Sequence, residues 1–352
     1  MDTNKQKNSN TTLAWREVVG RYQHPDIKRS SWQLINSIVP YFALWVLMWF
    51  SLSVSYWITL ALAILAAGFL VRIFIIFHDC GHGSFFKSKK ANNFWGTITG
   101  VLTFTPYEQW RHYHALHHAS SGNLDKRGFG DVWTLTYQEY LARPWLKRLG
   151  YRLFRHPIVM FGIGPIYTFL ISGRFAHQKD SRRARKSVIL TNFALLGIMI
   201  AAHFLIGIRA YLLIQLPVIT ISGAIGVWLF YVQHTFEPPY WERHTEWDFT
   251  TAALWGSSFY KLPKVLQWFS GNIGIHHIHH LSPLIPNYYL PQCQDENEIF
   301  HEIKPLTIRA SLKSLNMRIW DEDSNRMLSF REMRRLYEEK SQAYGVKHSS
   351  DY

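Results

Sequence analysis

The chain has only two cysteines among its 352 residues, Cys80 and Cys293. Two thiols are too few for a disulfide framework or for a four-cysteine iron–sulfur cluster. No glycine-rich dinucleotide fingerprint follows a candidate strand. No His-Pro-Gly-Gly haem motif occurs either, because neither His24 nor His156, each followed by proline, continues with glycine. If the protein carries out redox chemistry, its electrons must therefore come from another molecule.

Acidic side chains are also scarce. The sequence has 24 Asp and Glu against 38 Lys and Arg, which gives a formal charge of +14. Such an excess favours anionic partners, and no nucleic-acid-binding motif accompanies it. We therefore expect lipid headgroups and an acidic protein as partners, and no nucleic acid. The first 30 residues are polar and hold no signal-peptide core, so we expect the N-terminus to stay in the cytosol.

The sequence contains several long apolar runs. About 20 apolar residues cross the core of a bilayer, and four runs approach that length: residues 35–52, 56–77, 188–208 and 211–232. Trp and Tyr are common near their ends, as at membrane interfaces. Four buried helices of a soluble protein are the alternative. We expect an all-α membrane protein whose four transmembrane helices form two hairpins.

Three parts are expected along the chain: a basic cytosolic arm (1–33), a main domain (34–323) and a cytosolic tail (324–352). Two apolar segments inside the main domain, 94–105 and 158–171, are short for a span. We expect both to be interfacial or re-entrant helices.

The distribution of basic residues predicts the orientation. The N-terminal arm has six Lys or Arg, and the segment Gly83–Ser187 has 17, whereas the turn near Ser53 has none and the turn near Gly207 has one. Basic loops stay on the cytosolic side. We therefore expect a multi-pass membrane protein with both termini and the active site in the cytosol.

Three histidine motifs lie beyond the ends of these runs: His78-Asp79-Cys80-Gly81-His82, His114-Ala115-Leu116-His117-His118 and His276-His277-Ile278-His279-His280. On a helix, positions i, i+3 and i+4 share one face, so the imidazoles of each motif can reach one site. His234, at the end of the fourth run, is a plausible addition. The candidate ligands are His78, His82, His114, His117, His118, His234, His276, His279 and His280.

The number of these histidines predicts two metal ions, because a structural zinc needs four ligands and a catalytic zinc three. Imidazole binds iron, copper, zinc and nickel, so the residues alone do not name the metal. Asp79 could orient a ligand by accepting its other N–H. Asn272, four residues before the third motif, could do the same or hold a water. We interpret Cys80 as a packing residue, whereas the roles of His112 and His277 stay open.

The three motifs, in this order around paired hairpins, resemble the membrane fatty acid desaturase family. The resemblance extends from about residue 35 to residue 323. Over four stretches the chain is most similar to bacterial acyl-lipid desaturases of the Bacillus Δ5 type, which implies a bacterial cell membrane as its location: residues 77–86, 123–140, 231–237 and 271–286. The resemblance implies a diiron centre, O2 as co-substrate, and an external electron donor such as ferredoxin or flavodoxin. The reaction implied is formation of a cis double bond, at Δ5, in phospholipid acyl chains.

Some members of this family place an asparagine, acting through water, four residues before the histidine that corresponds to His234. Phe230 occupies that position here. An acyl chain must be held in one register, and we expect an apolar tunnel walled by the segments Phe94–Thr105, Ile158–Ile171 and Leu254–Phe269. The clusters 87–90 and 182–186 are candidate docking sites for the donor; the alternative is that they anchor the protein to anionic lipid headgroups.

Two other functions stay open. A diiron lipid or carotenoid hydroxylase or ketolase would use the same architecture, although the H-D-C-G-H form and the stretch Asn123–Arg127 favour desaturation. A histidine-rich metal transporter would place its ligands at the bilayer midplane on broken helices, whereas these motifs lie at the ends of the apolar runs.

Overall fold

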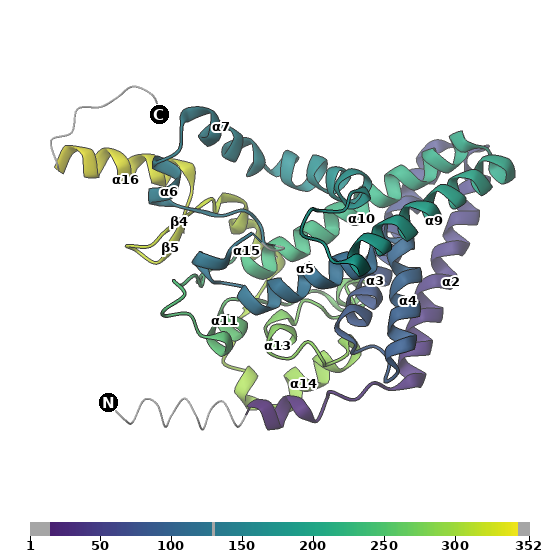
Figure 1. Ribbon diagram of the computed structural model, residues 1–352, viewed down its shortest axis with the longest axis horizontal. Coiled ribbons are helices and arrows are strands. Elements are labelled where there is room, and N and C mark those ends of the chain that lie inside the picture. The colour runs from purple at the N-terminus through teal and green to yellow at the C-terminus, as the bar shows by residue number, and fades with distance from the viewer. Residues whose placement is uncertain (1–14, 129–130, 344–352) are drawn as a thin grey trace.

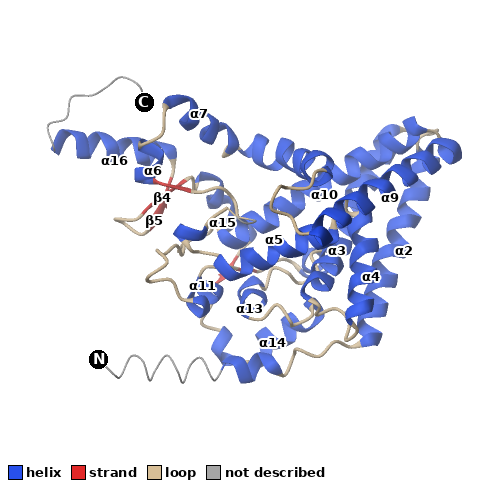
Figure 2. Cartoon of the chain, in the orientation of Figure 1, coloured by secondary structure: helices blue, strands red, loops and turns tan. Residues whose placement is uncertain are grey.

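The computed structural model describes residues 15–128 and 131–343, and helices dominate it (Figures 1 and 2). Four helices in this part of the chain are long and apolar enough to cross a membrane: α2 (Ile27–Ser51), α3 (Tyr56–His82), α9 (Arg182–Ile206) and α10 (Ile208–His234). The expected all-α fold with two helical hairpins is confirmed. The tips of the N-terminal arm and of the C-terminal tail lie outside the described residues.

Local sequence signals set the ends of these helices. The Asp26 side chain accepts hydrogen bonds from the backbone N–H groups of Lys28 and Arg29, and so caps the start of α2. Gly83 ends α3 in the left-handed conformation, with φ of 76°. A single residue, Gly207 (φ 83°), separates α9 from α10. Arg209, the one basic residue that our sequence analysis counted in the turn near Gly207, lies within α10 instead.

The helix α3 is the central element. It packs on α2 and on α10 through a core that includes Met48, Ala63, Ala66, Ile73 and Val218. Its 27 residues, at about 1.5 Å each, make it longer than the roughly 30 Å core of a bilayer. The last turns of α3, which carry the first histidine motif, therefore extend past the apolar layer.

The two shorter apolar segments form helices that are not straight spans. The first is α4 (Lys89–Leu102). The second follows α7 (Trp145–Phe154) after a bend of 63°. It consists of two π-helical turns around a short α-helix: η2 (Val159–Ile163), α8 (Gly164–Ile166) and η3 (Tyr167–Ile171).

The remaining elements form a cap at one end of the four long helices (Figure 1). The helix α5 (Tyr107–Ser120) crosses it, beside α13 (His276–Leu281). The other cap helices are α6 (Tyr137–Leu141), α11 (Phe249–Trp255), α12 (Lys264–Phe269), α14 (Leu290–Glu296), α15 (Ile308–Ser311) and α16 (Phe330–Ala343). From the N-terminal arm, Trp15, Val19 and Tyr22 pack on Ile278 and Leu281 of α13.

Two small sheets, which the sequence did not predict, join distant parts of the cap. In the first, β1 (Leu135–Thr136) pairs in parallel with β4 (Ile319–Asp321), which pairs antiparallel with β5 (Arg326–Leu328). In the second, β2 (Phe259–Tyr260) pairs in parallel with β3 (Pro305–Leu306). Next to β2, the His276 N–H donates to the Ser258 carbonyl and so fixes the start of α13.

Candidate metal centre

Nine histidines converge between the ends of the long helices and the cap. They form two groups, and within each group one nitrogen from every ring lies within 4.8 Å of the others. The first group is His78, His82, His114, His118 and His279; the second is His117, His234, His276 and His280. These are the nine residues that the sequence singles out as candidate ligands.

Helical geometry explains how the second and third motifs are shared between the groups. Successive residues of a helix turn by about 100°, so positions i and i+4 lie about 40° apart while i+3 and i+4 lie about 100° apart. In α5, the i, i+4 pair His114 and His118 joins the first group, and His117 points to the second. In α13 the i, i+4 pair His276 and His280 joins the second group, and His279 points to the first.

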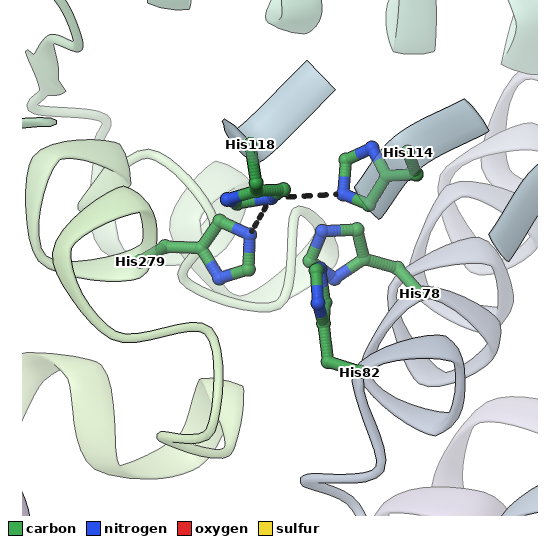
Figure 3. Close-up of side chains that lie close together, drawn as sticks. All are labelled: His78, His82, His114, His118 and His279. Carbon is green, nitrogen blue, oxygen red and sulfur yellow. Dashed lines mark hydrogen bonds between the residues drawn. The ribbon is translucent and has the colours of Figure 1, made fainter. Parts of the chain in front are cut away.

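The ring nitrogens lie at ligand-like separations. In the first group, Nε2 of His118 is 3.1 Å from Nε2 of both His114 and His279 (Figure 3). In the second, Nε2 of His234 is 3.1 Å from Nε2 of His117 and 3.0 Å from that of His276. Two nitrogens bound at right angles to one metal, with bonds of about 2.1 Å, would lie about 3 Å apart.

The chemistry of both groups fits metal binding. Burial, followed by the proximity of other imidazoles, lowers the pKa of five histidines on α5 and α13 well below its ordinary value: His114, His118, His276, His279 and His280. Their rings are therefore neutral, the form that binds metals. Nε2 of His82 and of His280 is buried and has no hydrogen-bond partner among the described residues. A metal ion would satisfy both.

The Asp79 carboxylate contacts a ring of the first group. Its Oδ1 lies 3.0 Å from Nδ1 of His78, while Oδ2 accepts hydrogen bonds from the backbone and the side chain of Asn287. Asn272, which we expected to hold His276 or a water, has another partner, because its amide donates to the Asn287 carbonyl. It thereby supports the loop that holds Asp79.

Asp131 is a site residue that our sequence analysis missed. Its Oδ1 lies 2.8 Å from Nδ1 of His117, and both side chains are buried. Asp131 follows the helix α5 in an irregular polar loop, where no periodicity predicts which side chain turns inward. The only available signal is the presence of a carboxylate in the polar stretch that follows the second motif.

Three further residues within or beside the motifs, Cys80, His277 and His112, lie outside the two histidine groups. Cys80 is a buried packing residue beside Phe77 and Tyr107, as expected. His277 lies outside both groups, against the rings of Phe259 and Phe300, and burial lowers its pKa to about 3. His112 also belongs to neither group.

An apolar cavity of about 290 Å³ reaches the histidines. Its walls include Phe74 and Ile75 of α3 and Val227 and Phe230 of α10, and its lining includes His78, His114 and His276. The Phe230 ring also packs against His117 and His234.

The segments expected to wall an acyl tunnel contribute to this cavity only in part. Thr103 lines this cavity from the first predicted wall, and Thr168 and Phe169 line it from the second. The third predicted wall, Leu254–Phe269, does not line it; α3 and α10 take that place. Two apolar helices that the sequence identified only as membrane spans thus also enclose the cavity.

Comparisons with known proteins identify the family of the chain. The profile of the fatty acid desaturase family matches residues 54–306, which include all three histidine motifs and His234. A fatty acid desaturase of Bacillus subtilis is 51% identical over 318 residues, 90% of each chain. The sn-1 acyl-lipid omega-3 desaturase (ferredoxin) of Synechocystis is 30% identical over 232 residues, 62% of this chain and 61% of that protein. The sn-1 oleoyl-lipid 12-desaturase of Synechocystis is 28% identical over 269 residues, 72% and 70% of the two chains. The chain belongs to the fatty acid desaturase family and is an oxidoreductase.

Proposed function

We propose that this protein introduces a cis double bond into the acyl chains of membrane phospholipids, with O2 as oxidant and two iron ions held by nine histidines. One observation carries the proposal: two groups of buried or half-buried imidazoles border an apolar cavity, with His78 and His114 of one group and His276 of the other in its lining. The Δ5 position, expected from the sequence resemblance, is the finer part of the proposal.

Bound iron and O2 supply an oxidant able to remove hydrogen from an unactivated methylene, which no side chain can do as acid or base. The residues of the chain then have three tasks. The histidines hold the metals, Asp79 and Asp131 orient two of the rings, and the cavity wall positions the acyl chain. Neighbouring methylenes are almost identical chemically, so register depends on where the apolar wall stops the chain.

The cavity wall is suited to positioning an acyl chain. Phe74, Phe169 and Phe230 place three aromatic rings in the lining, and Ile219 and Ser222 of α10 lie furthest from His234 along that helix. Ser222 already donates its hydroxyl hydrogen to the Ile219 carbonyl. An alkyl chain in this space would meet mostly carbon atoms and would exclude water from the reacting carbons.

The electron balance requires an external donor. Reduction of O2 to two waters takes four electrons, of which the acyl chain supplies two together with two hydrogens, and two further electrons and two protons must be added. Nothing in the sequence carries electrons. We propose an acidic carrier of the ferredoxin or flavodoxin class, docking on the cytosolic face of the cap; the name of the Synechocystis relative includes ferredoxin.

Product analysis tests the proposal directly. The protein is expressed in a bacterial host whose own acyl chains have no double bond at Δ5. Its phospholipid fatty acids are then analysed by gas chromatography–mass spectrometry with double-bond localisation. We expect a new cis-monounsaturated acid in the wild-type strain and none in a His276→Ala strain. A hydroxylated product would favour the hydroxylase alternative, and unchanged lipids despite protein that holds two irons would contradict the proposal.

A further inference from the structure

We propose that Asp131 is the positioning residue of the second metal site. A charged clasp, by which we mean the ion pairs of Arg127 with Glu139 and of Arg243 with Asp125 and Glu322, keeps Asp131 against His117. The inference rests on the proposed two-metal function. It assigns a role to Asp131 and to the polar residues Asn123–Arg127, which the nine-histidine site does not explain.

The contact between Asp131 and His117 fixes how the imidazole is presented. A carboxylate accepts hydrogen bonds and cannot donate them, so at 2.8 Å the hydrogen lies on Nδ1 of His117. The lone pair of that ring is then on Nε2, the atom that lies 3.1 Å from Nε2 of His234. Such carboxylate–histidine pairs fix the tautomer of a ligand and raise its basicity.

Each of the two histidine groups has one ring whose Nδ1 meets a carboxylate. Asp79 meets Nδ1 of His78 in the first group, and Asp131 meets Nδ1 of His117 in the second. Their supports differ. Asp79 neighbours its histidine on the same helix and accepts two hydrogen bonds from Asn287, whereas Asp131 lies on a loop 14 positions after its histidine.

Charged side chains hold the described residues on either side of Asp131. Arg127 makes a two-pronged contact with Glu139 and also donates to the carbonyls of Leu124 and Thr134. It thereby joins the residues before Asp131 to those after it. A planar guanidinium on a carboxylate adds geometric specificity as well as energy.

A second arginine ties the same loop to the rest of the cap. Arg243 bridges Asp125, at 2.7 Å, and Glu322, at 2.8 Å. The Asp125 carboxylate also accepts the His244 N–H, and the Leu124 N–H donates to the Glu242 carbonyl. Three segments far apart in the sequence therefore meet around the loop that presents Asp131.

The inference is tested by metal retention. Purified wild type, Asp131→Asn and Asp131→Ser are loaded with Fe²⁺ anaerobically, and bound iron is measured against a graded chelator. Losing an outer-shell partner typically weakens metal affinity about 10–100-fold. We expect both variants to lose one iron at chelator concentrations about 10–100-fold lower than wild type, and to keep the other. Asp131→Glu, which retains the carboxylate, should restore part of the loss.

The matched control is Asp180→Asn. Asp180 is also a buried carboxylate with several hydrogen bonds, but its partners are Gln109, Tyr113 and the His177 N–H rather than a ligand ring. We expect this variant to release iron as wild type does. Wild-type iron retention in both Asp131 variants would overturn the inference, and so would equal loss from both sites. A wild type that never holds two irons would instead overturn the proposed function.

Discussion

Nε2 of His234 lies 3.0 Å from Nε2 of His276, although the two residues are 42 positions apart. His234 ends α10, one of the four long apolar helices, whereas His276 begins α13 in the cap. A metal held by both would tie the membrane helices to the cap. The geometry therefore supports His234 as the ninth ligand, in addition to the eight histidines of the motifs.

Replacing His234 with alanine should remove one iron and lower desaturation by about 100-fold or more, beyond the loss typical of outer-shell residues. The reason is that the second group has only four imidazoles, so three would remain. The measurement is product yield in membranes together with iron per purified chain.

His203→Ala is the control for that variant. His203 lies on α9, outside both groups, with its ring against Phe204, and its loss should change neither iron nor product. Full activity of His234→Ala would exclude the nine-ligand version of the site.

The cavity makes a prediction about substrate length. Gly226 lines it, and a Cβ added there would have no other atom within 4 Å. A leucine side chain at this position would fit sterically and would occupy part of the cavity. We expect Gly226→Leu to lower activity on long acyl chains by about tenfold or more, relative to activity on shorter chains. One methylene too many in an apolar pocket already lowers the rate on a substrate by about that factor.

Gly197→Leu provides the matched comparison, because Gly197 is an exposed glycine of α9 that also has nothing within 4 Å. Its chain-length profile should equal that of wild type. If Gly226→Leu shows the wild-type profile as well, the acyl chain does not occupy this cavity.

The scarcity of cysteine allows a clean test of orientation. Both native thiols are buried, so single cysteines at the exposed positions Ser53 and Lys179 can be labelled selectively. Since basic segments stay inside, a membrane-impermeant maleimide should label Ser53→Cys in intact cells and Lys179→Cys only after lysis. Labelling of Lys179→Cys in intact cells would refute a cytosolic cap.

Electrostatic docking predicts that turnover with a purified acidic ferredoxin falls as salt rises. The exposed Lys and Arg side chains of the clusters 87–90 and 182–186 would attract such a donor, and the Debye length is only about 8 Å at physiological ionic strength. The rate of ferredoxin reduction by its reductase is measured at each salt concentration as the control. Turnover independent of salt would argue that these clusters contact lipid headgroups instead.

Sequence periodicity predicted the parts of the site that depend on local structure. The i, i+3, i+4 spacing identified the motif histidines because a helix fixes their relative directions, and hydropathy identified α3 and α10 because each span is continuous. Asp131, Asn287 and the clasp at Arg243 could not be found this way. Their roles depend on contacts between segments that only the folded cap brings together, and the partner of Asn272 was misjudged for the same reason.

The most direct test of the account is the iron content of the purified protein. Wild type, loaded anaerobically with Fe²⁺ and freed of excess metal, is analysed by inductively coupled plasma mass spectrometry against protein concentration from amino-acid analysis. The nine-histidine site predicts two irons per chain in wild type and a lower value in His117→Ala, which removes a ligand of the second group. A wild-type ratio of one or less, or two irons retained in His117→Ala, would contradict it.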